Sequence, residues 1–432
     1  MRVHRNCCGL DVHKKIIAAC LIKEDAEGNS IYEKRLFGSM TRDLHELAQW
    51  LCTAQVTAVA MEATGVYWMP VWNVLEPYGL QLLLINPEHY KAVRGKKTDL
   101  KDGTRIAELL QDGRLEGSYV PAVAIRVLRD LTRYRTKLVQ YQSSLANRIQ
   151  RLLEQCNIKL ASVASDVLGV SAMAMLRALA QGETDAMRMA DMAKKQLRKK
   201  IPQLQLALEG CVLPHHRWLL REMIEDLDHV GTKITRIEET IEQQMRPFQS
   251  AVERWVTVPG IKHRLAWTLV AEVGPSVEAF PSAADLVSWA GVCPGNNQTG
   301  GKRKSGTTRA GNPWLRRALC EAAWAASKTK GTYLQAQFRR LAALRGPKRA
   351  LIAVANSILT AGYYMLQRAT TYQELGPAYF DKRNTVRATR RLVKRLEALN
   401  ILGRRWRSKP WGALEVFANQ SDVSRNPWHE RD

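Results

Sequence analysis

Two short apolar stretches near the N-terminus each carry a carboxylate, and this combination constrains the fold more than any other feature. The stretch CGLDVHKKIIAACLI has the apolar content of a strand and includes Asp11, and the stretch AVAMEATG includes Glu62. An unpaired carboxylate in such a setting costs several kcal/mol or takes up a proton. We therefore expect both acids to meet a compensating group in the folded protein.

Residues 1–115 alternate between apolar runs and amphipathic segments. Strands are expected at CGLDVHKKIIAACLI, SIYEKRLFGSM, VTAVAMEATG and LQLLLINP, and helices at DLHELAQWLCTA, GVYWMPVWNVLEPYG and TDLKDGTRIAELLQDG. The first two strands can pair as a hairpin, and the later strands alternate with helices. This order predicts an α/β region in which helices flank a mixed sheet.

Asp99 and Asp102 add two more acids at the start of the last of these helices. Because they are three residues apart, they project from one face of the helix. If the strands of Asp11 and Glu62 are neighbours, the four acids can converge, and their oxygen atoms suit Mg²⁺, which supports phosphodiester cleavage. Taken singly, Asp99 and Asp102 are also compatible with ordinary helix-start residues that interact with the helix dipole or with nearby lysines.

The balance of charge points to a polyanionic partner. The chain has 65 Lys and Arg against 41 Asp and Glu, which gives a formal net charge of +24. Nucleic acid is the leading partner for such a charge. A membrane partner is not expected, since there is no apolar run of about 18 residues and no lipidation signal. The eight cysteines form no Cys-x-x-Cys pair, which is typical of reduced cysteines in a cytoplasmic protein.

Two long helical segments follow, at IRVLRDLTRYRTKLVQYQSSLANRIQRLLEQ and WLLREMIEDLDHVGTKITRIEETIEQQM, and they predict a helical hairpin or coiled-coil arm. One face of the first segment is rich in arginine and includes Arg129 and Arg133. Asp130 is the only acid between residues 126 and 153. This imbalance favours nucleic-acid binding by that face, and a merely solvated surface is the alternative.

The C-terminal half contains two further candidates for phosphate contact. VPGIKHRLAWTLVAEVG has the form of two helices joined by a Pro-Gly turn, which can present backbone amides to a phosphate or can be a plain helical turn. The stretch TGGKRKSGTTRAGN, residues 299–312, contains no acid, and a helix follows it. The predicted phosphate-binding residues here are Lys302, Arg303, Lys304, Ser305, Arg309 and Arg316.

Several motifs resemble, in order, the transposases of the IS110 insertion-sequence family. They are GLDVHKK, MEATGVYW, INPEHYKAVRGKKTDLKD, VPGI, WAGVCPGNN, GGKRKSG, GNPWLRRAL and EAAWAA, between about residues 7 and 380. The resemblance implies a RuvC-like domain of the RNase H fold at 1–118, a helical coiled-coil region at 119–250, and a mostly helical transposase domain with a helix-hairpin-helix-like segment at 251–380. A basic extension at 381–432 lies outside the family pattern. The implied Mg²⁺ ligands are Asp11, Glu62, Asp99 and Asp102.

The resemblance also implies an activity. Members of this family exchange strands between donor and target DNA, are guided by a structured bridge RNA, and act as dimers that pair into tetramers. Their catalytic serine forms a covalent link to a DNA phosphate, and Thr299 occupies its position in this chain. The threonine hydroxyl can attack a phosphate, although its methyl group restricts its rotamers. Ser305 is the alternative nucleophile, and both hydroxyls could instead only bind phosphate.

Two other functions are compatible with the same residues. The first is a junction-resolving nuclease, in which the metal site is used and water replaces the protein hydroxyl. The second is a nucleic-acid-binding protein that has lost its chemistry through the threonine at position 299. Only the recombinase leaves protein attached to DNA when the reaction is trapped, so the products discriminate among the three.

Overall fold

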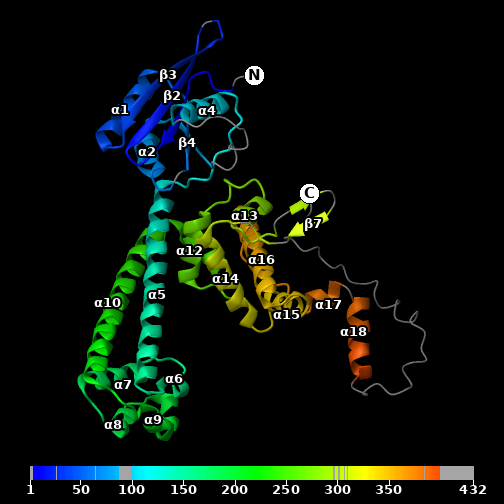
Figure 1. Ribbon diagram of the computed structural model, residues 1–432. Coiled ribbons are helices and arrows are strands. Elements are labelled where there is room, and N and C mark those ends of the chain that lie inside the picture. Colours follow the sequence, from blue (N-terminus) through cyan, green and yellow to red (C-terminus); the bar gives the residue numbers. More distant parts are fainter. Residues whose placement is uncertain are drawn as a thin grey trace, which may run out of the picture. The chain divides into compact units, whose positions relative to one another are not determined.

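The computed structural model describes residues 3–25, 27–63, 65–86, 99–294, 297–299, 302–305, 307–308, 310–383 and 385–398. For residues 99–101, 297–299 and 302–305, and for seven positions of the last helix (387, 388, 391, 392, 395, 397 and 398), only the backbone is described. The chain divides into two compact units, Met1–Pro121 and Ala122–Asp432 (Figure 1).

The N-terminal unit contains one sheet with helices on both faces. Its elements are β1 (Cys7–Val12), β2 (Ile16–Glu24), β3 (Ser30–Gly38), α1 (Thr41–Thr53), β4 (Ala58–Glu62), α2 (Trp68–Leu75), the 3-10 turn η1 (Glu76–Tyr78), β5 (Gln81–Ile85) and α4 (Asp99–Gln111).

The sheet has five strands in the order β3-β2-β1-β4-β5. Strand β2 is antiparallel to both β1 and β3, and β4 is parallel to both β1 and β5. The stretch CGLDVHKKIIAACLI, expected as one strand, forms two. The exposed residues His13, Lys14 and Lys15 form the turn between them, because three consecutive polar side chains cannot remain in a buried strand. The sequence-based prediction of a mixed, helix-flanked sheet is confirmed.

Successive side chains of each strand point to opposite faces of the sheet, and each face is covered by an apolar layer. Leu10, Ile17 and Met61 belong to a layer that α1 and α2 cover with Leu47, Leu51, Val71 and Leu75. Cys7, Cys20 and Ala60 point to the other face, where Ile106, Ala107 and Leu110 of α4 close the core. Since successive side chains of a strand point to opposite faces, every residue of β1 can be assigned to one of the two layers.

The C-terminal unit is almost entirely helical. Its elements are α5 (Val123–Gln155), α6 (Leu160–Val163), α7 (Val170–Gln181), α8 (Ala186–Asp191), η2 (Lys195–Lys200), α9 (Ile201–Leu208), α10 (Pro214–Met245), η3 (Arg246–Phe248), α11 (Gln249–Val256), α12 (His263–Val273), α13 (Ala283–Trp289), β6 (Asn297–Thr299), β7 (Lys302–Ser305), α14 (Pro313–Lys328), α15 (Tyr333–Arg345), α16 (Pro347–Gln367), α17 (Tyr379–Arg383) and α18 (Thr385–Ala398).

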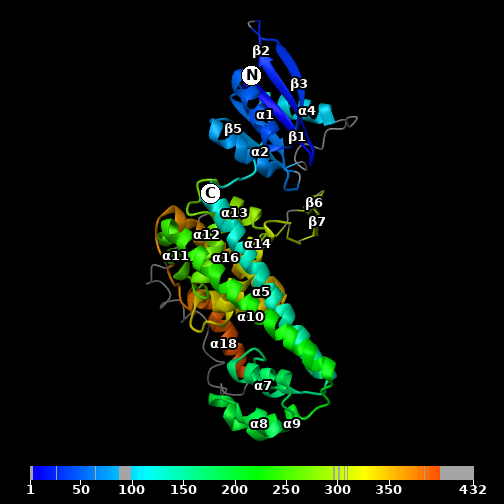
Figure 2. The same cartoon turned by 90° about the vertical axis from the view of Figure 1, so that its left-hand side faces the viewer.

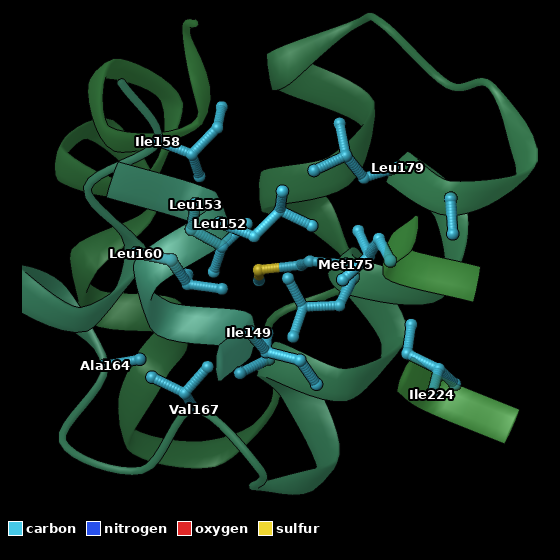
Figure 3. Packing of buried hydrophobic residues seen from close by; sticks show 14 of the residues in the cluster. Ile149, Leu152, Leu153, Ile158, Leu160, Ala164, Val167, Met175, Leu179 and Ile224 are labelled. Atoms are coloured by element: carbon cyan, nitrogen blue, oxygen red, sulfur yellow. The ribbon is translucent and has the colours of Figure 1, made fainter. Parts of the chain in front are cut away.

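The long helices α5 and α10 run side by side in both views (Figures 1 and 2). At one end of this pair, the short helices α6 to α9 form a cap with an apolar core of its own. Figure 3 shows Ile149, Leu152 and Leu153 of α5 packed with Met175 and Leu179 of α7. This core fixes one end of α5 without any contribution from the last third of the chain.

The helices from α11 onward pack around α16. Gly362 on α16 allows a very close approach, because a Cβ atom there would overlap the indole ring of the fully buried Trp255. By length and composition α16 could cross a membrane, but 56% of its most apolar window is buried inside the fold. Because α16 contacts α11, α13, α14 and α15, a core helix explains its apolar composition.

Candidate functional site

Asp11 lies on the central strand of the sheet, one residue before the end of β1. Its side chain is buried. Leu10 and Val12 point into the layer under α1 and α2, so Asp11 points to the opposite face, which α4 covers.

Glu62 is the last residue of β4, the parallel neighbour of β1. The register pairs Leu10 with Met61, so Asp11 and Glu62 each follow a paired residue by one position. Neighbouring strands are about 4.8 Å apart, and residues at matching positions point to the same face. The two carboxylates therefore lie beside each other at the C-terminal ends of two neighbouring strands, on the face that α4 covers.

Helix α4 brings Asp102 to the same face. Its backbone packs directly on β1, since a Cβ atom on Gly9 would collide with the Gly103 carbonyl oxygen and the Ala107 amide nitrogen. A glycine at position 9 permits a contact that any side chain would prevent. Asp102 comes immediately before Gly103 and is half-buried. The close packing therefore holds Asp102 near Asp11.

The pKa of Asp11 is shifted by burial and by the charges of its neighbours. Burial is the main cause that raises the pKa of Asp11, and the charges of Glu62 and Asp102 raise this pKa further. His13 lowers the same pKa through its charge and through a hydrogen bond of 3.2 Å between its Nε2 and Asp11 Oδ2. The three acids therefore repel one another, and a bound cation would relieve this repulsion.

Among the described side chains, no group of three or more His, Cys, Asp or Glu residues is arranged to hold a metal ion. The fourth predicted acid, Asp99, begins α4, and its side chain lies outside the described part of the structure. The donor chemistry still fits a hard cation, since Asp11, Glu62 and Asp102 offer only carboxylate oxygens on one face of the sheet.

The segment that carries the two candidate nucleophiles, Thr299 and Ser305, forms a two-stranded hairpin that was not predicted from the sequence. Strands β6 and β7 pair antiparallel, with Thr299 opposite Lys302 and Asn297 opposite Ser305. These strands were not predicted because NQT and KRKS contain only polar residues, so neither has an apolar face. The following predicted residues have side chains outside the described part of the chain: Thr299, Lys302, Arg303, Lys304, Ser305 and Arg309.

Arg316 connects α14 to the base of this hairpin. Its Nη2 donates a hydrogen bond of 2.9 Å to Thr308 Oγ1, and Thr308 forms an isolated bridge with Pro294. The side chain predicted to bind phosphate therefore makes a contact within the protein and fixes the segment that leads into α14.

Arg129 and Arg133 take a different place from the one expected. The Arg133 guanidinium forms two hydrogen bonds with the carboxylate of Glu272, and Arg129 donates to the backbone carbonyls of Ala271 and Glu272. Their guanidinium groups point toward the end of α12, where the Glu272 carboxylate has no exposed surface, and not onto an open basic face. This partner could not be predicted from the acids near the two arginines in sequence, because Glu272 lies on α12.

Glu272 and Asn312 were not singled out from the sequence, although a signal was present. Glu272 interrupts the apolar helix segment WTLVAEV in the same way that Asp11 interrupts its strand. A buried carboxylate requires partners, so the argument applied to Asp11 predicts that Glu272 has them too. Asn312 has the signature of a helix N-cap before Pro313, and it caps α14.

Comparisons with known proteins agree with the arrangement of these motifs. Residues 8–158 match the family model of DEDD transposases of the IS110 type, and residues 253–339 match the model described as transposase, IS116/IS110/IS902 family. Together the two matches cover more than half of the chain and include Asp11, Glu62 and Thr299.

Named relatives extend the similarity beyond the two models. The chain is 25% identical to a transposase for insertion sequence element IS1111A of Coxiella burnetii, over 84% of this chain and 90% of that protein. It is also 25% identical to a probable family 20 transposase of Pseudomonas aeruginosa, over 73% of this chain and 85% of that protein. A putative transposase of Sinorhizobium fredii is 24% identical over 76% of this chain. The chain belongs to the IS116/IS110/IS902 family of insertion-sequence transposases, enzymes that act on DNA.

Proposed function

We propose that this transposase cuts and rejoins DNA with two chemical sites, an acidic metal-binding site in the N-terminal unit and a hydroxyl nucleophile in the C-terminal unit. The single observation that supports it best is the position of Asp11 beside Glu62 on adjacent strands, with Asp102 on the helix that covers them. The proposed domains are a RuvC-like RNase H fold at 1–118, a coiled-coil arm at 119–250, a transposase domain at 251–380 and a basic extension at 381–432.

The four acids Asp11, Glu62, Asp99 and Asp102 would hold Mg²⁺, which when bound stabilises negative charge on phosphate oxygens. The protein supplies the arrangement. Strands β1 and β4 hold two carboxylates in register, and α4 brings Asp102 to the same face. His13 steadies Asp11 through its hydrogen bond to Oδ2.

Thr299 is the proposed nucleophile. Its hydroxyl loses a proton to solvent, a bond forms between Thr299 Oγ1 and the phosphorus, and one phosphorus–oxygen bond of the DNA strand breaks. The released deoxyribose oxygen takes up a proton. Rejoining reverses these steps with the hydroxyl end of another strand. Ser305 pairs with Asn297 in the backbone register of the same hairpin, and it is the alternative nucleophile.

Donor DNA, target DNA and a structured bridge RNA are the proposed partners of a homodimer or tetramer that acts in the cytoplasm. The formal net charge of +24 supports binding of polyphosphates. In this proposal, base pairing with the RNA selects the sequence, and the protein supplies phosphate contacts and chemistry.

A trapping experiment tests this function. A nicked DNA substrate that carries the element's end should leave the wild-type protein covalently attached to DNA at Thr299 in the presence of Mg²⁺. Asp11→Asn should form no adduct and still bind RNA and DNA. Asp112→Asn, at an exposed position after α4, is the matched control and should react normally. Free cleaved ends without an adduct would instead indicate a nuclease that uses water, and binding without cleavage would indicate a protein without chemistry.

A further inference from the structure

We propose that Glu272 is a positioning residue that holds the first turn of α14 against helix α5. The segment that follows the β6–β7 hairpin leads into this turn, so Glu272 also holds the C-terminal end of the hairpin segment. The proposal rests on the proposed function, because this hairpin carries Thr299. Glu272 lies near the end of α12, and its side chain has no exposed surface.

Helix α5 holds Glu272 from one side. Arg133 Nε donates to Glu272 Oε1 at 2.7 Å, and Arg133 Nη2 donates to Oε2 at 2.8 Å. Arg129 donates to the carbonyl oxygens of Ala271 at 2.9 Å and of Glu272 at 2.6 Å. The paired hydrogen bonds of a guanidinium fix both the distance and the plane of the carboxylate.

Asn312 extends this contact to α14. Its Nδ2 donates to Glu272 Oε2 at 2.7 Å, and its Oδ1 accepts from the amides of Trp314 at 3.0 Å and Leu315 at 3.2 Å. One amide side chain therefore caps the helix with one end and binds Glu272 with the other. The first turn of α14 cannot shift without breaking the cap or the bond to Glu272.

The same contacts define where the hairpin segment begins and ends. The backbone N–H of Asn312 donates a hydrogen bond to the Trp289 carbonyl oxygen at 3.1 Å. A Cβ atom on Gly311 would collide with the backbone of Gly291. The end of α13 and the start of α14 are thus in direct backbone contact, on either side of the hairpin. Arg129 lies over the ring of Trp289, and Arg133 lies over the ring of Trp314.

A role in stability alone does not require a charge at this position. Replacing a buried ion pair by apolar residues of similar volume is often neutral or stabilising, whereas an ion pair with hydrogen bonds imposes one geometry. A nucleophile must be held within a fraction of an ångström of its productive position, and misplacement by about 1 Å can reduce a rate about 100-fold. The hydrogen bonds around Glu272 provide such a constraint at the C-terminal end of the hairpin segment.

Two variants test the inference. Glu272→Gln keeps the shape of the side chain and removes its charge. Asn312→Asp keeps the capping oxygen and removes the donor that reaches Glu272. The matched control is Glu238→Gln. It breaks the ion pairs of Glu238 with Arg135 of α5 and Arg264 of α12, and Glu238 forms no hydrogen bond or ion pair with α14 in the described structure.

The first readout is independent of activity. Amide hydrogen exchange of full-length protein should accelerate at Trp314 and Leu315 by about tenfold in both test variants and stay unchanged in Glu238→Gln. The second is the rate of adduct formation under single turnover, which should fall about 100-fold in both test variants with DNA affinity retained.

Other outcomes either overturn the inference or separate it from the proposed function. If Glu272→Gln has the exchange pattern and adduct rate of Glu238→Gln, Glu272 has no positioning role. If both variants lose DNA affinity and melting temperature together, Glu272 is only a structural residue. If the wild-type protein forms no adduct, the proposed function fails, and the exchange at α14 still decides whether Glu272 holds that turn. Should Glu272→Gln not fold, Asn312→Asp gives the same comparison.

Discussion

The guanidinium group of Arg133 donates two hydrogen bonds to the carboxylate of Glu272, which lies 139 residues later in the sequence. This pair joins the N-terminal part of α5 to the end of α12. Because the Glu272 side chain is fully buried, the loss of its partner would leave a charge that water cannot reach.

We expect Arg133→Met to lower the free energy of unfolding of the C-terminal unit by about 3 kcal/mol, since it leaves Glu272 with an incomplete set of partners. Urea denaturation monitored by tryptophan fluorescence measures this change. Arg177→Met is the control, because Arg177 pairs with Asp228 on the surface, where both side chains are about half exposed. Its effect should be less than about 1 kcal/mol, and an equal effect of the two changes would contradict the prediction.

Gly9→Ala should separate α4 from the sheet, because the added methyl group meets the backbone of Gly103 and Ala107. We expect a loss of about 2 kcal/mol in the stability of the N-terminal unit and a loss of metal-dependent cleavage as Asp102 moves away. Gly231→Ala, in α10, is the control. A Cβ atom there has no neighbour within 4 Å, so this variant should gain about 1 kcal/mol from helix propensity.

Thr299→Ser should retain or increase strand exchange, because serine offers the same hydroxyl without the methyl group that restricts its rotamers. Thr299→Ala should eliminate the covalent adduct, and Ser305→Ala should leave it. Mass spectrometry of the trapped peptide reads the result directly. The reverse pattern, with an adduct in Thr299→Ala and none in Ser305→Ala, would transfer the role to Ser305.

Burial, together with the nearby Tyr379, raises the pKa of Tyr333 to about 12. An unfolded tyrosine ionises near pH 10, so above this pH the unfolded state loses its proton first. Stability should therefore be independent of Tyr333 below pH 10 and should fall between pH 10 and 12, by up to about 2.7 kcal/mol. Urea midpoints across this range measure the decline. Tyr333→Phe should make the decline smaller, and an unchanged curve would show that Tyr333 is not responsible.

Much of the fold was predictable from the sequence, because apolar runs report burial directly. The runs that contain Val59 and Leu84 form strands, and the apolar spacing of α5 places Leu145 and Ile149 in a core. The turn at His13–Lys15 was missed because the apolar residues on both sides were counted together, although three exposed polar residues separate them. Apolar composition shows where buried strands are present, and hydrogen-bond pairing decides where they end.

The candidate sites were predictable only in part. A carboxylate in an apolar run signals a buried acid, so Asp11 and Glu62 could be found from sequence, and their adjacency required the parallel register of β1 and β4. The partners of Arg129 and Arg133 could not be found by inspecting neighbouring residues. Glu272 is brought to them by the packing of α12 on α5, a contact that no local pattern encodes.

Helix α5 is anchored independently at its two ends. Arg129 and Arg133 bind the end of α12, and Leu145, Ile149 and Leu152 are packed in the separate apolar core of the α6–α9 cap. The helix has 33 residues and spans about 50 Å. Because α5 is one continuous helix that is held near both ends, we expect a tilt of the cap to move Arg129 and Arg133 and, through Glu272, the first turn of α14.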